Sequence, residues 1–329
     1  AALVALASWF TIFPQTAMGV FSKAEDGTFA EGAWGLMSVN QLGSNAMFSA
    51  MLVGLVAAQL FVTFTKKGWV IKMPEQVPPS VARSFEALTP TAIVVFIIGS
   101  ITYYARFDWH AFIGKLIQPL LSATDTLPSV WILVILVTFF WSFGIHGVSI
   151  VGSIARPLWL QLLDQNTAAA AAGQPLTAIA AEPFFQWFIW IGGSGCTIGL
   201  VIALALFAKS SYGKQLGRAA LVPGIFNINE PIIFGFPLML NPTLFVPFVF
   251  LPVVFILVAY FLTTAGILPV VSGIGAPTGT PLIISGFICG GWQMAAFQIG
   301  ATIVSTLVYL PFFKILDRQA CEQEQNEGN

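Results

Sequence analysis

The residue best placed to do chemistry is a carboxylate in a strongly apolar part of the chain. Glu230 lies in the stretch VPGIFNINEPIIFGFPLMLNP and is the one charged residue between Arg218 and Lys314. An ionisable group in such surroundings is costly, so contact with a substrate, an ion or a proton is its default interpretation. Asn227 and Asn229 add hydrogen-bond donors and acceptors beside it. The alternative is that Glu230 only satisfies backbone amides at a helix end.

A second candidate group is the imidazole of His146 in WSFGIHGVSIVG. The glycines on either side favour an opened backbone, which indicates a site residue, and a packed core histidine is the alternative. Trp141 could offer an aromatic face to a sugar ring or simply pack. Carboxylate, amide, imidazole and aromatic groups together suit a neutral polyol, so these residues favour a sugar. A proton relay through Glu230 and His146, in an ion-coupled secondary transporter or channel, is the alternative function.

Composition places these residues in a membrane protein. The chain is 57% hydrophobic and 8% charged, with a mean hydropathy of +0.86, whereas soluble domains are about a quarter charged. A net charge of −1 gives no reason to expect nucleic-acid binding. Cys196, Cys289 and Cys321 show no paired or metal-like spacing, so the sequence predicts no disulfide framework, metal site or cofactor.

Apolar runs indicate where helices cross the bilayer, which takes about twenty residues for each pass. The candidate spans are residues 1–21, 46–65, 90–105, 184–208, 244–262 and 295–313, and the polar stretch 22–45 reads as a loop. Three basic clusters belong in the cytoplasm by the positive-inside rule. They are Lys66, Lys67 and Lys72, then Lys209, Lys214 and Arg218, and finally Lys314 and Arg318.

Counting passes between these clusters predicts which segments fold back. The region 131–163 must begin and end outside, as two passes or a re-entrant hairpin, and 222–240 and 273–292 must be re-entrant. Their Gly and Pro content opposes a continuous helix, and broken backbone at membrane depth needs protein or a watery cavity around it. The segments VPPSVARSFEALTP and FDWHAFIGKLIQPLL are amphipathic and should lie flat on the membrane. The sequence therefore predicts an all-α integral membrane protein, a multi-span helical transporter with re-entrant hairpins.

The stretch around Glu230 also carries a family resemblance. GIFNINEPIIFGFPLMLNP is similar to the signature of the membrane-embedded IIC component of phosphotransferase-system sugar transporters, in the lactose/cellobiose/diacetylchitobiose branch. IKMPEQVPPSVARSFEALTP, GIHG and PLIISGFICGGW resemble the same family in the same order. The resemblance covers nearly the whole chain.

The resemblance implies a mechanism. The IIC component binds a β-linked disaccharide inside the membrane, carries it across by an elevator-like movement, and holds it while a separate phosphorylated IIB protein donates phosphate. Glu230 and His146 become the implied catalytic residues, with Glu230 as a general base at the sugar 6-hydroxyl. The implied substrate-binding residues are Asn229, Glu230, His146, Trp141, Asn227 and Thr278. Family members often carry tryptophan where this chain has Thr278 in APTGTPL, which leaves the identity of the disaccharide open.

The family pattern also implies a division of the chain. We expect residues 1–125 to form an N-terminal scaffold and dimerisation domain, 126–318 a substrate-binding transport domain, and 319–329 a polar, frayed cytoplasmic tail. Similar proteins are longer at the N-terminus, so we expect earlier membrane segments to precede Ala1. The expected setting is a homodimer in the lipid bilayer of the bacterial plasma (inner) membrane, with IIB as its cytoplasmic partner.

Overall fold

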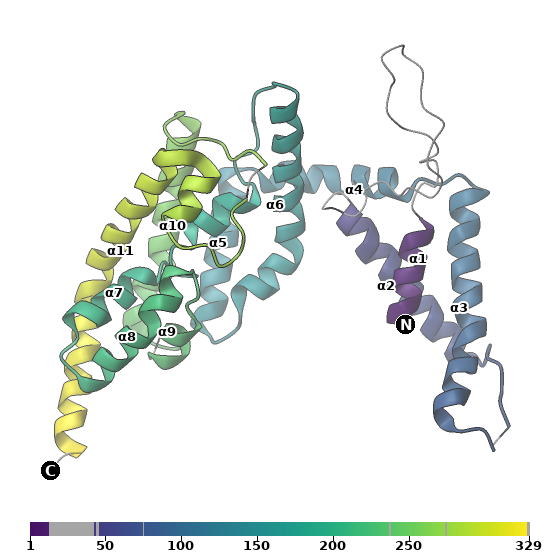
Figure 1. Cartoon of the computed structure of the whole chain (residues 1–329), viewed down its shortest axis with the longest axis horizontal. Helices are drawn as coiled ribbons and strands as arrows, with labels where there is room; N and C mark the ends of the chain where they lie inside the picture. Colours follow the sequence, from purple (N-terminus) through teal and green to yellow (C-terminus); the bar gives the residue numbers. More distant parts are fainter. Residues whose placement is uncertain (13–42, 44–45, 75, 237, 274, 328–329) are drawn as a thin grey trace. The chain divides into compact units, whose positions relative to one another are not determined.

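The computed structural model describes residues 1–12, 43, 46–74, 76–236, 238–273 and 275–327. Helices are the only regular elements of these residues, as the predicted all-α fold requires (Figure 1). The chain forms two compact units, Ala1–Pro119 and Leu120–Asn329, called the first and the second unit below. The predicted loop 22–45 and the end of the span 1–21 lie outside the described residues, apart from Gly43.

The first unit contains α1 (Ala2–Thr11), α2 (Met47–Lys66) and α3 (Pro79–Tyr103), followed by most of α4 (Trp109–Thr124). Its core is a cluster of aliphatic side chains from the first three helices. The cluster consists of Val4, Ile12, Val53, Ala57, Val94 and Ile98.

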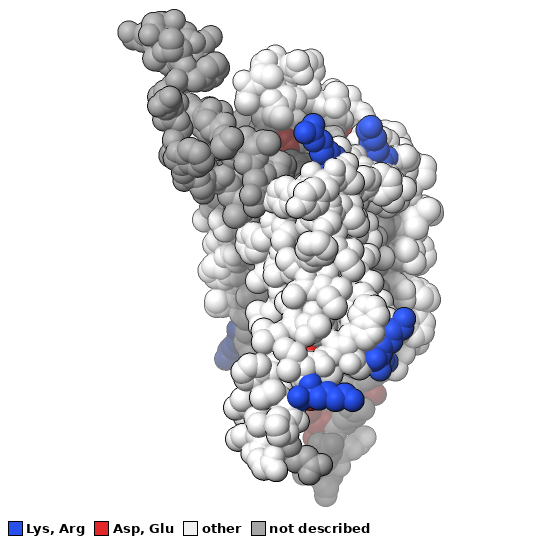
Figure 2. Space-filling view, turned by 90° about the vertical axis from the view of Figure 1, so that its right-hand side faces the viewer, with Lys and Arg blue, Asp and Glu red and all other residues white. Residues whose placement is uncertain are grey.

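On the face in Figure 2, Lys and Arg side chains lie near the two ends and an uncharged band lies between them, as expected of helices that cross a membrane.

One prediction for the first unit is wrong. The amphipathic segment before Pro90 was expected to form a separate helix lying flat, but α3 runs without interruption from Pro79 through Pro90 to Tyr103. Proline removes one backbone donor and usually kinks or ends a helix, yet α3 continues through Pro90, whose side chain is buried. Thr91 also donates its hydroxyl to the carbonyl of Ala87, 2.6 Å away, within the same turn.

After the end of α4, the second unit forms a helical hairpin over the region 131–163, for which the sequence predicts two passes or a re-entrant hairpin. Helix α5 (Leu127–Ser142) and α6 (Gly147–Ala171) pack together and are joined by a short turn that ends at His146. The unit continues through the π-helix η3 (Phe184–Ile189), α7 (Ile198–Phe207), α8 (Ser211–Ile225), α9 (Glu230–Gly235), α10 (Pro242–Thr264) and α11 (Ile284–Glu327).

Broken backbone is confirmed in the two segments where the sequence predicts it. Helix α8 ends at Ile225 and α9 starts at Glu230, inside the predicted segment 222–240. Among the described residues of 273–292 the backbone before α11 is irregular, and α11 itself is kinked at Gly290 and Gly291, which have non-helical dihedral angles.

Two further expectations need correction. The predicted continuous span 184–208 is interrupted between η3 and α7, where residues 190–197 form turns. The predicted frayed tail from 319 is helical to Glu327, because α11 continues through it. Among the described residues, four helices, α2, α3, α10 and α11, are long and apolar enough to cross a membrane, and α4 with α5 forms a fifth candidate bent by 85°.

Candidate sugar site

Glu230 is the first residue of α9, a six-residue helix with Pro231 in its first turn. Proline is well tolerated there, since its fixed φ suits a helix start and its missing N–H would have no helical partner. A carboxylate at this position also interacts favourably with the positive end of the helix dipole. The side chain is exposed, so it is available to a ligand.

His146 caps the N-terminus of α6. The Ser149 amide donates to its Nδ1 over 3.1 Å, and the Ser149 hydroxyl lies 2.8 Å from the same nitrogen. A nitrogen that accepts an N–H bond carries no hydrogen, so the neutral ring holds its hydrogen on Nε2. His146 is exposed, and its Nε2–H can therefore donate to a ligand oxygen.

Ring contacts connect these two residues through Trp141. The Trp141 ring centroid is 4.3 Å from that of His146 and 6.3 Å from that of Phe234 on α9. Glu230 and Phe234 are four residues apart and share one face of α9. The Leu240 amide also donates to the Ser142 carbonyl over 2.8 Å, which fixes the chain after α9 to the end of α5. The structure thus brings both predicted motifs into one region, and Figure 1 shows α9 and the α5–α6 turn at the lower end of the second unit.

Trp141 itself is buried, at 2% exposure. Its ring packs on His146 and Phe234, so in this structure it supports the two motifs instead of presenting an open face. Thr278 is exposed in a turn, where the Thr280 amide donates to the Pro277 carbonyl over 3.1 Å.

Asn227 and Asn229 use their amide groups within the protein. Asn227 accepts from the Gly192 amide (2.6 Å), and Asn229 donates to the Ser194 carbonyl (2.9 Å). Gly193 lies close against Asn229, since a Cβ atom at Gly193 would be 2.3 Å from the Asn229 Cγ. These two side chains therefore hold the α8–α9 turn against the break in 190–197.

The break at 190–197 is the feature that sequence reasoning missed. The sequence GGSGCT (192–197) interrupts the apolar run and was the available signal. Side chains donate hydrogen bonds to its carbonyls, which have no helical partner, as buried backbone requires. Thr197 donates to Gly192 (2.6 Å), Ser305 to Cys196 (2.6 Å) and Tyr309 to Gly195 (2.7 Å).

Gln298 joins η3, which precedes this break, to the start of α11. Its Nε2 donates to the Trp187 carbonyl (2.7 Å), and its Oε1 accepts from the Ile283 amide (2.7 Å). The Leu282 amide in turn donates to the Ile225 carbonyl at the end of α8, 2.8 Å away. Three separate interruptions of helical structure therefore meet in the second unit.

An ion pair was also missed. Arg156 lies inside α6, in the region taken as apolar, and its guanidinium donates to Glu182 over 3.1 Å. The Glu182 side chain is 13% exposed, so Arg156 compensates a largely buried carboxylate. Among the described residues, no cluster of His, Cys, Asp and Glu side chains could hold a metal ion.

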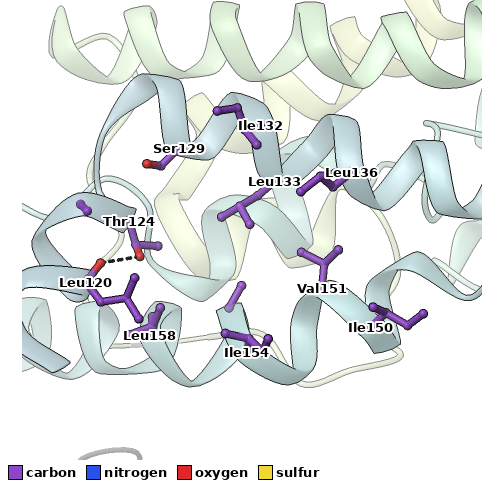
Figure 3. A pocket seen from close by; sticks show the side chains of 12 residues that line it. Leu120, Thr124, Ser129, Ile132, Leu133, Leu136, Ile150, Val151, Ile154 and Leu158 are labelled. Atoms are coloured by element: carbon purple, nitrogen blue, oxygen red, sulfur yellow. Dashed lines mark hydrogen bonds between the residues drawn. The ribbon is translucent and has the colours of Figure 1, made fainter. Parts of the chain in front are cut away.

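A cavity of about 400 Å³ lies between α5, α6 and the end of α4 (Figure 3). Aliphatic side chains line it, with Thr124 and Ser129 as the polar exceptions, and the Thr124 hydroxyl donates to the Leu120 carbonyl at 2.7 Å. Such walls suit an apolar occupant and offer few partners to sugar hydroxyls. The predicted site residues do not line this cavity.

Comparison with known proteins agrees with this fold. The family profile "Phosphotransferase system, EIIC" matches residues 1–252. The chain is 38% identical over 300 residues to the cellobiose-specific EIIC component of Geobacillus stearothermophilus, covering 88% of this chain and 66% of that protein. It is 36% identical over 299 residues to the lichenan permease IIC component of Bacillus subtilis, covering 89% of this chain and 66% of that protein.

A solved structure is similar along almost the whole chain. The crystal structure of ChbC, the IIC component from the N,N'-diacetylchitobiose-specific phosphotransferase system, superposes with a TM-score of 0.84 at 36% identity. The match covers 98% of this chain and 76% of that one. This chain spans about two thirds of the length of the curated relatives it matches. The resemblance read from the Glu230 stretch is therefore confirmed, and the chain belongs to the EIIC family of the phosphotransferase system.

Proposed function

We propose that this chain is the membrane-embedded part of a sugar permease that binds a β-linked disaccharide and carries it across the membrane. The names of its relatives support this substrate class, since they specify cellobiose, lichenan and diacetylchitobiose. Glu230 accepts hydrogen bonds from sugar hydroxyls, and the Nε2–H of His146 donates one. The observation that carries the proposal is the Trp141 ring, which packs between His146 and the face of α9 that bears Glu230.

We further propose that phosphate reaches the sugar from a separate IIB protein, with Glu230 as the general base at the 6-hydroxyl. Two cysteines of the chain are poorly placed to carry a phosphoryl group themselves. Cys196 is buried and donates to the Ile189 carbonyl over 3.0 Å, and Cys289 is buried and accepts from the Ala276 amide over 3.2 Å. Some relatives, such as a lactose-specific component of Staphylococcus haemolyticus, are named EIICB, which joins the two parts in one protein.

For assembly, we propose that the first unit pairs with a second copy of the chain and that the second unit moves with the sugar. A rigid body keeps its hydrogen-bonding groups paired with the sugar while the site faces each side of the membrane. The three interlocked breaks of the second unit support such a body.

The test uses membranes from cells that express the protein, with radiolabelled cellobiose, lactose or diacetylchitobiose. We expect phosphorylated sugar to appear only when phosphorylated IIB is added, for at least one of the three sugars. Glu86→Gln, a carboxylate-to-amide change in α3, is the matched control for Glu230→Gln and should keep full activity. Uptake of unmodified sugar driven by an ion gradient, with no dependence on IIB, would instead favour the secondary transporter.

A further inference from the structure

The C-terminal part of α11 holds the start of α8 through two carboxylates. Asp317 accepts from the Lys209 amide (2.7 Å), the Ser210 amide (3.2 Å) and the Ser210 hydroxyl (2.6 Å). Glu324 accepts from the Ser211 amide (3.0 Å) and the Tyr212 amide (2.9 Å). The two carboxylates are seven positions apart, which places them on one face of α11, about two turns apart.

These bonds satisfy the amides that a helix start leaves without partners. Four successive backbone N–H groups, 209 to 212, donate to α11. The next, that of Gly213, donates to the Ser210 hydroxyl oxygen over 3.0 Å. Negative charge at a helix N-terminus also interacts favourably with its dipole. The start of α8 is thus held by residues more than a hundred positions later in the chain.

From the start of α8 the connection continues to α9. The Tyr212 hydroxyl donates to the carbonyl of Gly235, the last residue of α9. At the other end of α9, Asn229 is fixed by its bond to Ser194. Helix α9 is therefore fixed by hydrogen bonds at both ends. At its C-terminal end, Tyr212 bonds to Gly235, and Glu324 in turn bonds to the Tyr212 amide.

We propose that Glu324 and Tyr212 are positioning residues that hold α9, and with it Glu230, in the geometry needed for the reaction at the sugar hydroxyl. The inference rests on the proposed function of Glu230. A general base acts only within hydrogen-bond reach of its proton, so a small displacement of α9 lowers the rate of the chemical step. Because Glu230 also binds the sugar, the same displacement weakens binding as well.

The test compares Glu324→Ala with Glu322→Ala on the same helix. Glu322 is exposed and pairs with Arg318 at 3.1 Å, an (i, i+4) surface pair of small energetic value. Hydrogen exchange of the α9 amides, measured on the whole protein without sugar, reports the opening of α9. We expect exchange about three- to tenfold faster in Glu324→Ala and in Tyr212→Phe, and a change below about twofold in Glu322→Ala. Phosphorylation kcat should fall about three- to tenfold in the first two variants and KM should rise, while both stay within about twofold of the wild type in Glu322→Ala.

The double variant Tyr212→Phe/Glu324→Ala decides whether the two residues act in series. The effects of substitutions at two residues of one connection do not add. The exchange rate and the kcat of the double variant should therefore be changed no more than those of the more strongly affected single variant. Equal exchange in Glu324→Ala and Glu322→Ala, additive effects in the double variant, or faster exchange with unchanged kcat would each overturn the proposal. Wild-type protein that phosphorylates no sugar would overturn the proposed function instead, and the exchange data would still show whether α11 holds α9.

Discussion

At the scale of single residues, the charge of Glu230 is the property to test first. Replacement by Gln keeps the size of the side chain but loses charge-assisted hydrogen bonds, each worth about 1.5–3 kcal/mol. We expect sugar affinity to fall roughly 10- to 100-fold and phosphorylation to be suppressed, while the melting temperature stays unchanged. Titration calorimetry measures the affinity, and a thermal melt measures the melting temperature. Unchanged affinity and phosphorylation would reduce Glu230 to a structural cap.

Thr278 is the residue to test for selectivity between disaccharides. It is exposed in a turn, so a larger side chain fits without repacking the core. Aromatic rings contribute about 0.5–1.5 kcal/mol beyond their buried area, so Thr278→Trp should change the ratio of Kd values for cellobiose and diacetylchitobiose roughly 2- to 10-fold. Competition binding measures the ratio. Thr264→Trp, at the exposed end of α10, is the control, and an equal ratio in both variants would remove Thr278 from the site.

At the scale of elements, the contact between the 190–197 break and α9 depends on one glycine. Gly193 has a φ of +91° and lies against Asn229, so Gly193→Ala adds both backbone strain and a collision. We expect this change to lower stability by about 1–3 kcal/mol and to weaken sugar binding through the displaced start of α9. Thermal unfolding and sugar titration check the two effects.

Gly300→Ala is the matched change in a regular part of α11, where a Cβ meets no atom within 4 Å. Alanine is the better helix former by about 1 kcal/mol, so this variant should be as stable as the wild type or slightly more so. Similar losses in the two variants would contradict the role given to Gly193.

The sequence could predict the two breaks that contain unusual residues, and it could not predict the third. In 222–240 and 273–292, glycine and proline within an apolar run interrupt the hydropathy pattern, and Glu230 adds a charge. In 184–208 the run remains apolar on average, so the sequence predicts one continuous membrane span there despite its glycines. Its carbonyls are satisfied by Ser305 and Tyr309, and such pairing across more than a hundred residues leaves no local pattern.

The same reasoning applies to the site. The residue types at Glu230 and His146 indicated polar chemistry, and the structure brings their motifs into one region. The internal roles of Asn227 and Asn229 could not be read from the sequence, because an amide beside a carboxylate looks the same whether it binds a ligand or the backbone. Their partners, Gly192 and Ser194, belong to the break that the sequence concealed.

At the scale of the whole molecule, the orientation in the membrane can be tested at the loop before α8. The basic residues around it belong in the cytoplasm by the positive-inside rule. With Cys321 replaced by Ser, a cysteine introduced at Ser211, which is exposed, should not react with an impermeant maleimide added to intact cells. It should react in inverted vesicles. Efficient labelling from outside would show that the loop before α8 faces outward and that the predicted orientation is reversed.

Pairing of two copies through the first unit predicts where crosslinks form. Leu55 on α2 is 67% exposed and Val222 on α8 is 62% exposed, so cysteines at the two positions are equally accessible. We expect oxidation to link two subunits through Leu55→Cys and not through Val222→Cys, as seen by non-reducing electrophoresis. Crosslinking chiefly at Val222 would assign the interface to the second unit.

The bonds from α11 to earlier parts of the second unit have a consequence for how the protein is made. Four backbone groups of this unit form hydrogen bonds with side chains that lie 108 to 114 residues further along the chain. They belong to Trp187, Gly195, Cys196 and Lys209. At translation rates of about 5–20 residues per second, these backbone groups leave the ribosome roughly 5 to 20 seconds before their partners. During that interval the Gly195 and Cys196 carbonyls lack the partners that they have in the finished protein. Insertion of the last helix therefore completes the second unit, and a chain released before Gln298 would present an unfinished break to membrane proteases.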